Sequence, residues 1–494
     1  MKYVPAAKTA TILVGLALFA MLVQGYHPGA EDDGVYLAAI KKDLNPALYP
    51  HDADFFRVQL QATIFDKVIA GSIRLTHLSH LYHLSVGVTI LLWQFASVVL
   101  ILWGCLRIAR RVFVETHAQW AAVAFVAALL TLPVAGTALY LDDQYLHPRA
   151  LATAAILAAV VAVLDRRRIL AGCLLSLAFV IHPLMAAFGI SYCIFLSWRR
   201  TAEPSKFLVA AMLPLGWIFQ PTSPAWRQAA VTRDYYFLGR WQWYEWLGAI
   251  APLFLLWWIY RLGRKSGSIV QARMASRLVW FGVFQFAVAV AIMLPPSLDR
   301  LKPFQPMRFL HLLYLLFCLL AGGLIGQRIL GRHAYRWLLL FVPLAAGMFW
   351  AQRQTFPASP HLEWPGAKPG NSWVEAFDWV RENTPVDSLF ALDPYYMKLP
   401  GEDFHSFRAL AERSALADYV KDPSVATQVP SLAVRWKEEV DAQKDWGNFQ
   451  VKDFQRLKSR FGVSWVVLVS PGVQGMDCPF QNNAVRVCRI PDAD

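Results

Sequence analysis

Long apolar runs separated by short charged stretches are the main pattern along the chain. A run of about twenty apolar residues is long enough to cross the hydrocarbon core of a bilayer as a helix. Such runs lie near residues 9–26, 83–106, 118–138, 150–164, 205–220, 245–260, 278–295, 307–326 and 336–353. A shorter pair, near 169–181 and 184–197, predicts a tight helical hairpin that turns at His182-Pro183. We therefore expect a polytopic α-helical membrane protein with about eleven transmembrane helices.

The apolar runs end near residue 353, and the remaining chain has mixed polarity. Two runs rich in β-branched or apolar residues, 388–392 and 465–469, predict buried strands. Apolar residues at helical spacing precede them, at Trp373, Phe377 and Val380. We therefore divide the chain into a transmembrane domain, residues 1–353, and a C-terminal α/β domain, residues 354–494.

The segment between the first two apolar runs, residues 27–82, is too polar to cross a bilayer. Phe56, Leu60, Ile64 and Val68 recur at four-residue intervals within it. This spacing predicts a helix that lies in the membrane interface with its apolar face in lipid. A helix packed on the outer domain would show the same spacing, so both interpretations stay open.

Basic residues predict which side of the membrane each loop faces, because short loops rich in Lys and Arg stay in the cytoplasm. Under the expected helix count, these residues fall on one side: Lys2, Lys8, Arg107, Arg110, Arg111, Arg166, Arg167, Arg168, Arg199, Arg200, Lys206, Arg261, Arg264, Lys265, Arg273, Arg277, Arg328, Arg332 and Arg336. The N-terminus is therefore expected in the cytoplasm and the C-terminal domain outside, as in a multi-pass bacterial inner-membrane protein with a periplasmic domain.

Composition supports this class, because 56% of the residues are hydrophobic and only 16% are charged. The net charge of +13 is dispersed over many short loops. We therefore attribute it to membrane topology and expect no nucleic-acid binding.

Cysteine placement adds a prediction about the C-terminal domain. Cys478 and Cys488 are the two cysteines outside the apolar runs, and they flank a turn at Asn482-Asn483. This spacing predicts a disulfide across a loop or hairpin, which persists in an oxidising compartment. Two unpaired buried thiols are the alternative. The chain shows no CxxC or Cys/His array with the spacing of a zinc site.

Two acidic clusters follow apolar runs that exit on the same side of the membrane. The first follows the first run, at Glu31, Asp32 and Asp33, and the second follows the third run, at Asp142 and Asp143. His147 and Arg149 come shortly after the second cluster. If residues 143–147 are helical, Asp143 and His147 share one face. Both clusters are expected beside the outer leaflet, where they can meet a membrane-bound substrate.

This order of elements resembles the GT-C superfamily of multispan membrane glycosyltransferases. The resemblance rests on Asp32-Asp33-Gly34-Val35-Tyr36 at the start of the first outer loop, on the second acidic loop and on an outer α/β domain after the last span. The superfamily includes protein O-mannosyltransferases, lipid A aminoarabinose transferases and oligosaccharyltransferase catalytic subunits. The resemblance implies transfer of a sugar from a polyprenyl-phosphate donor to a lipid, glycan or protein acceptor, with inversion at the anomeric carbon.

The resemblance also implies roles for the acidic residues. Asp32 matches the first acid of the family and is expected to be the general base, and Asp33 is expected to orient the acceptor or to help bind a cation. Asp32, Asp143 and His147 are candidate ligands for a divalent cation, Mg²⁺ or Mn²⁺. Asp142 belongs to the same acidic loop. Under the alternative interpretation, the acids cap and solvate helix termini.

A lipid phosphate as leaving group requires cations on the outer side. Arg149 and Arg308 are our candidates, and snorkelling toward lipid headgroups is the alternative for both. The expected lining of the same cavity is completed by Glu31, Tyr36, His182 and Arg240. For His182, at the hairpin turn, a purely structural role is the alternative.

Other classes compete with a glycosyltransferase. A flippase or secondary transporter of a lipid-linked substrate would also have many spans, and a GT-C relative without catalysis could bind glycans through its outer domain. The chain contains no Walker A, GxSxG or HExxH motif, which argues against P-loop nucleotide hydrolysis, serine esterase and zincin chemistry. The expected partners are the sugar donor, its acceptor and membrane lipids.

Overall fold

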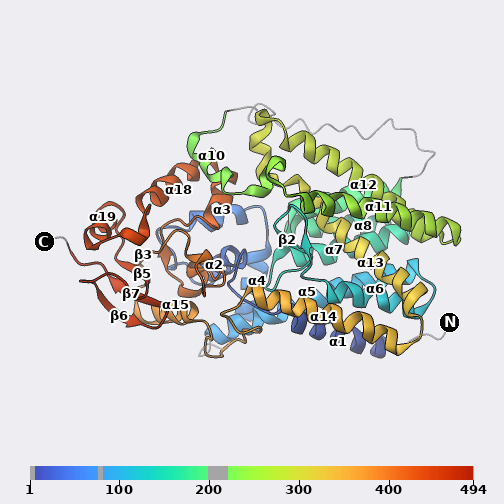
Figure 1. Cartoon of the computed structure of the whole chain (residues 1–494), viewed down its shortest axis with the longest axis horizontal. Coiled ribbons are helices and arrows are strands. Elements are labelled where there is room, and N and C mark those ends of the chain that lie inside the picture. The colour runs from blue at the N-terminus through green and yellow to red at the C-terminus, as the bar shows by residue number, and fades with distance from the viewer. Residues whose placement is uncertain (1–5, 76–81, 199–220, 493–494) are drawn as a thin grey trace.

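A computed structural model describes residues 6–75, 82–198 and 221–492. Long helices form a bundle at one end of an elongated molecule, and a sheet with its covering helices forms the other end (Figure 1). The connection after the first helix, residues 25–75, lies between the bundle and the sheet end.

Helices long and apolar enough to cross a membrane dominate the bundle. The described residues contain six of them. They are α1 (Ala6–Gln24), α5 (Tyr82–Val112), α11 (Trp243–Lys265), α12 (Ile269–Met293), α13 (Phe309–Ile325) and α14 (Ala334–Thr355). Three shorter apolar helices complete the bundle: α7 (Pro148–Leu164), α8 (Arg168–Ile181) and α9 (Pro183–Ser197). The helices therefore support the membrane class, whereas the expected number of eleven spans stays a prediction.

Two of the expected spans need separate comment. The run near 205–220 lies outside the described residues. The run near 118–138 was expected to be one helix and is not, because α6 (Thr116–Ala128) ends ten residues earlier. Its 13 residues rise about 20 Å, which is less than the thickness of a hydrocarbon core. Pro133 begins the short strand β1 (Pro133–Val134), which pairs with β2 (Leu139–Tyr140) instead of continuing the helix.

The short ribbon is held by a close approach of the backbone to an aromatic side chain. Gly136 has φ +62°, and a Cβ at this position would lie 2.1 Å from a ring carbon of Trp241. A glycine is therefore required both by the left-handed backbone and by the contact.

The hairpin at His182-Pro183 is confirmed. The Nδ1 of His182 accepts a hydrogen bond from the Met185 amide, so His182 caps α9 after ending α8. Pro183 occupies the first position of α9, where the missing amide proton costs nothing.

The expected outer helix over residues 56–68 is divided between two helices. These are α3 (Asp54–Leu60) and α4 (Phe65–Leu75), which follow α2 (Asp33–Leu44). Phe56 is buried, but Val68 is 43% exposed, so the four-residue repeat does not form one continuous face. Both helices bury an apolar face against protein: Phe55 of α3, for example, packs in a cluster with Trp226 and Trp436. This favours the interpretation of helices packed on the outer part of the protein.

The described part of the C-terminal domain contains a five-stranded sheet, with the order β4-β3-β5-β7-β6. The strands are β3 (Leu389–Ala391), β4 (Ser414–Ala415), β5 (Trp465–Val469), β6 (Asp477–Gln481) and β7 (Val485–Arg489). β4, β3 and β5 are parallel, and β7 and β6 continue antiparallel. The helices are α15 (Ser372–Asn383), α16 (Phe407–Ala411), α17 (Asp422–Gln428), α18 (Pro430–Ala442) and α19 (Val451–Phe461).

The predicted elements of this domain are present, and each has a local cause. α15 begins where the Asn371 side chain accepts hydrogen bonds from the amides of Trp373 and Val374, and it ends just before Thr384-Pro385. β5 is central in the sheet and is buried over four of its five residues, which explains its unbroken apolar sequence.

The predicted disulfide is confirmed. Cys478 of β6 and Cys488 of β7 are bonded across the terminal hairpin. The bridge joins β6, the edge strand of the sheet, to its neighbour β7.

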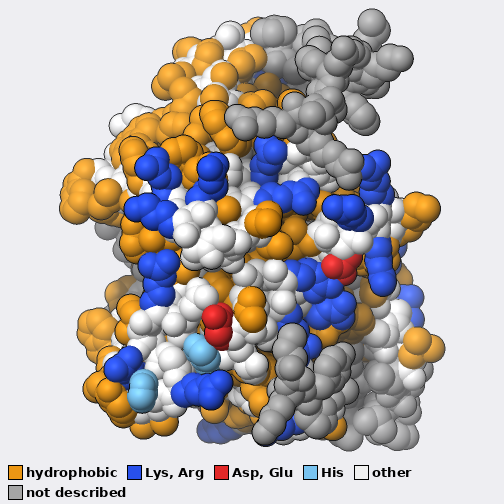
Figure 2. All heavy atoms as spheres, turned by 90° about the vertical axis from the view of Figure 1, so that its right-hand side faces the viewer, with side chains coloured by type: hydrophobic (Ala, Val, Ile, Leu, Met, Phe, Trp, Pro, Cys, Tyr) orange, Lys and Arg blue, Asp and Glu red, His pale blue; other side chains and the backbone are white. Residues whose placement is uncertain are grey.

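Basic residues gather at the end of the bundle that is remote from the sheet. Figure 2 views this end, and Lys and Arg side chains form a band across it between apolar surfaces. The last turns of α5 and α11 contribute Arg110, Arg111, Arg264 and Lys265. This grouping agrees with the basic loops facing one side of a membrane, while the orientation itself stays a prediction.

Candidate active site

A cavity of about 1620 Å³ lies between the helical bundle, the connection formed by residues 25–75 and the C-terminal domain. Pockets for small ligands usually enclose about 300–1,000 Å³, so this cavity has room for two reactants. Eight residues proposed from the sequence line it: Glu31, Asp32, Tyr36, Asp143, His147, Arg149, His182 and Arg308. Three others do not line it: Asp33, Asp142 and Arg240.

Asp32 stands at the N-terminus of α2, where the chain leaves the turn after α1. Its side chain is 40% exposed, within a cavity that it lines. The Nζ of Lys421 lies 3.0 Å from its Oδ1 and also donates to the carboxylate of Glu31. The backbone amide of Asp32 donates to the hydroxyl of Tyr145 at 3.3 Å, which ties this turn to the second acidic loop.

The surroundings of Asp32 keep its carboxyl group ionised. Burial alone would raise its pKa, but the positive charges of Lys421 and Arg308 and the nearby His147 outweigh burial and lower the pKa well below its usual range. Asp32 is therefore a carboxylate at every pH at which the protein is expected to work.

Asp33 does not line the cavity, and its expected contact with an acceptor or a cation stays a prediction. Its Oδ2 accepts a hydrogen bond from the Gly29 amide at 2.7 Å, and the residue is buried. Burial raises its pKa to about 7. The side chain closes the turn between α1 and α2, which is a structural use of the second acid.

Residues 141–147 are not helical, so Asp143 and His147 do not share a helix face. The loop bends, and His147 caps α7 by accepting a hydrogen bond from the Arg149 amide at 2.9 Å. The Asp143 carboxylate pairs with the guanidinium of Arg149. Asp142 is buried behind the cavity, and burial beside Asp143 raises its pKa well above the usual range.

Arg149 and Arg308 present unpaired donors within the cavity lining. Arg149 is 2% exposed, yet its Nε and Nη1 have no hydrogen-bond partner, and the Nε of Arg308 also lacks one. Buried donors without partners are rare in native proteins, because each costs about 1–3 kcal/mol. A bound anion would supply the missing acceptors.

Three aromatic rings of the cavity lining lie close to one another. The ring of His147 lies 4.7 Å from that of Tyr36 and 6.0 Å from that of His182, measured between centroids. The two histidines cap neighbouring helices, so their positions are determined by the same contacts that begin α7 and α9.

Arg240 was expected to line the cavity and is not among its lining residues. Its Nη1 pairs with Asp234 at 2.7 Å, and its guanidinium lies 5.0 Å from the ring of Phe237.

The cavity does not fit the expected divalent cation. No group of three or more His, Cys, Asp or Glu side chains suited to a metal ion occurs within residues 6–75, 82–198 and 221–492. Asp32 is already bound by Lys421, Asp143 by Arg149, and the Nδ1 of His147 by a backbone amide. Cations of the protein therefore take the place that a metal ion would need.

Several lining residues were not predicted from the sequence. They are Tyr145, Arg233, Arg300, Lys398 and Lys421. Lys421 and Lys398 belong to the C-terminal domain, which has no local sequence signal that connects it with a membrane site. Arg233 and Arg300 stand in loops that are expected outside, where an Arg that departs from the expected inside location of basic residues is the available signal.

Comparisons with known proteins bear on one segment. Residues 371–441 match a family model described as a domain of unknown function, DUF6798. This segment runs from α15 to α18 and contains both Lys398 and Lys421. No curated protein matches the chain.

Proposed function

We propose that the protein is a membrane glycosyltransferase that transfers a sugar from a polyprenyl-phosphate donor to an acceptor on the extracytoplasmic face. The observation that supports this most is the convergence in one cavity of Asp32 with the unpaired donors of Arg149 and Arg308. A carboxylate and two phosphate-binding guanidinium groups are the groups that such a transfer needs.

The walls of the cavity suit a lipid-linked donor. Phe179, Leu184 and Ala187 from the α8–α9 hairpin, with Val134 and Leu139 from the short ribbon, line one side. An apolar wall formed by membrane helices can accept part of a polyprenyl chain, while the guanidinium groups bind the phosphate.

The proposed reaction is a displacement with inversion. A hydroxyl oxygen of the acceptor attacks the anomeric carbon and forms the new bond, while the bond from that carbon to the phosphate oxygen breaks. The electron pair leaves with the polyprenyl phosphate, and the hydroxyl proton passes to Asp32. Arg149 and Arg308 stabilise the charge that develops on the phosphate.

The test compares each cavity residue with a similar residue outside the cavity. Transfer from polyprenyl-phosphate sugars is measured in membranes, with donor cleavage and acceptor labelling followed together. We expect Asp32→Asn and Arg308→Met to reduce turnover at least 100-fold, as expected for lost acid–base and charge-stabilising groups. Asp234→Asn and Arg240→Met, which change an ion pair away from the cavity, should keep wild-type turnover.

The outcomes separate the competing classes. Unchanged turnover in Asp32→Asn would refute the assigned role. Donor that crosses vesicle membranes intact, with no glycosidic bond formed, would establish transport instead. Donor binding without any cleavage by folded wild-type protein would establish a non-catalytic binding function.

A further inference from the structure

Lys421 connects the C-terminal domain directly to the proposed base. It stands immediately before α17, and its side chain is 13% exposed. Its Nζ donates to Glu31 and, at 3.0 Å, to Asp32, although these residues are 389 or more positions away in the chain. One lysine thus neutralises part of the charge of two adjacent carboxylates within the cavity.

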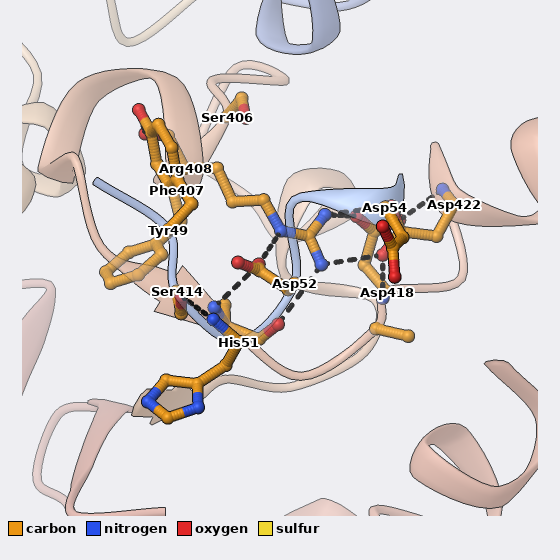
Figure 3. Close-up of polar contacts among 12 residues, drawn as sticks. Tyr49, His51, Asp52, Asp54, Ser406, Phe407, Arg408, Ser414, Asp418 and Asp422 are labelled. Carbon is orange, nitrogen blue, oxygen red and sulfur yellow. Dashed lines mark hydrogen bonds and ion pairs between the residues drawn. The ribbon is translucent and has the colours of Figure 1, made fainter. Parts of the chain in front are cut away.

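The position of Lys421 is determined by a buried ionic network beside it. Figure 3 shows the guanidinium of Arg408 between Asp52 of the outer loop and Asp422, the first residue of α17. Its Nε lies 2.5 Å from Asp52, and two of its nitrogens lie 2.8 and 3.0 Å from the Asp422 carboxylate. Because Asp422 follows Lys421 in the chain, the network holds the lysine against the outer loop.

The ion pair with Lys421 makes Asp32 a weaker general base. Lys421 is the first of the charges that lower the pKa of Asp32 against the effect of burial. A general base works best when its pKa lies near the working pH. Asp32 is therefore a weak base while Lys421 holds it, and the pair must open before the carboxylate can accept a proton efficiently.

An anionic ligand in the same cavity can open the pair. Glu31 and Asp32 are 32% and 40% exposed, so a ligand can reach the lysine between them. A phosphate offers Lys421 acceptor oxygens in place of the carboxylates, and loss of the lysine lets burial raise the affinity of Asp32 for a proton.

We propose that Lys421 inhibits Asp32 until the donor binds. The phosphate of the bound donor then draws Lys421 from Glu31 and Asp32, and Asp32 is free to act as the base. The inference rests on the proposed function, because it assigns the opening of the pair to the lipid phosphate. It also gives the segment that matches DUF6798 a role in controlling the cavity.

The experiment measures the ion pair itself. A carbodiimide joins a lysine and a carboxylate that are in direct contact, and mass spectrometry quantifies the linked peptides. In detergent-solubilised full-length protein, Lys421 should link to Glu31 or Asp32. Saturating farnesyl phosphate, a short probe of the donor's phosphate and tail, should reduce this product at least tenfold. The Lys458–Asp492 pair, whose atoms lie 2.7 Å apart and whose residues do not line the cavity, is the internal standard for reagent activity.

Two controls sharpen the result. Farnesol has the same tail without the phosphate and should leave the cross-link unchanged. Lys437→Met removes an exposed lysine of the same domain that does not line the cavity and should keep both the cross-link and its response to the probe. A loss with farnesol equal to that with farnesyl phosphate would overturn the inference, because the tail would then open the pair.

Failure of the inference differs from failure of the proposed function. If farnesyl phosphate binds the wild type and the cross-link persists, the inference alone is wrong. If farnesyl phosphate does not bind at all, the proposed donor class is wrong, and the inference falls with it.

Discussion

Replacing Arg408 with methionine tests how the C-terminal domain is held on the connection formed by residues 25–75. The substitution removes the hydrogen-bonded cation between Asp52 and Asp422 while keeping an apolar stem. The side chains of these two aspartates are 0% and 3% exposed, so water cannot readily replace the lost partner. Loss of one partner from a buried ion pair costs about 3–5 kcal/mol.

An exposed pair on the same domain provides the control. Lys437 and Asp441 are 38% and 47% exposed and stand four residues apart on α18. Such pairs contribute about 0.3–0.5 kcal/mol, so Lys437→Met should have almost no effect. The contrast between the variants isolates the effect of burial.

Peptide-level hydrogen exchange measures the free energy of local opening. In Arg408→Met, amides of α3 and of α16–α17 should exchange about 150- to 4,000-fold faster at pH 8, the factor that corresponds to about 3–5 kcal/mol. The effect should be smaller at pH 6, because burial raises the pKa of Asp422 to about 7 and protonation removes its unpaired charge. A change below tenfold at pH 8, or a larger change at pH 6, would refute the reasoning.

Two further predictions concern the C-terminal domain. His405 lies 3.1 Å from a carboxylate oxygen of Glu363, and although burial opposes its charge, this pairing raises its pKa to about 9. The stabilisation is therefore complete below about pH 6.5, the value for an unfolded His, and is lost as the pH rises through 9. Between pH 6.5 and pH 9 the wild type should lose about 3 kcal/mol of opening free energy, measured by hydrogen exchange, and Glu363→Gln should abolish most of this loss. An unchanged dependence on pH in the variant would contradict the assignment. Replacing Cys478 and Cys488 with alanine removes a cross-link between residues 10 positions apart and should destabilise the terminal hairpin by about 2.7 kcal/mol. Hydrogen exchange of the β6 and β7 amides measures this loss. Equal protection in both proteins would show that the sheet alone holds the hairpin.

Patterns within one element were predicted well from the sequence. The spacing of Trp373, Phe377 and Val380 predicted α15, and the unbroken apolar run at 465–469 predicted β5. The hairpin at His182-Pro183 was also predicted, because a proline that follows a capping side chain marks the start of a new helix.

Predictions that assumed a continuous helix were less accurate. Apolar composition continues to residue 138, but α6 ends at Ala128, because hydrophobicity does not distinguish a helix from a buried ribbon. The repeat from Phe56 to Val68 likewise crosses the break between α3 and α4, and its last member is exposed.

The sequence by itself determined that helices long enough for a membrane alternate with polar loops, and that acids and arginines follow particular apolar runs. These patterns involve residues that are close together in the chain. Apolar runs must be buried in protein or lipid because exposing them to water is unfavourable. The tertiary structure decided that Asp32 faces the cavity while Asp33 closes a turn, and that Lys421 reaches both Glu31 and Asp32. An ion pair between such distant positions depends on how the C-terminal domain packs on residues 25–75, and that packing is determined by buried contacts such as those of Arg408.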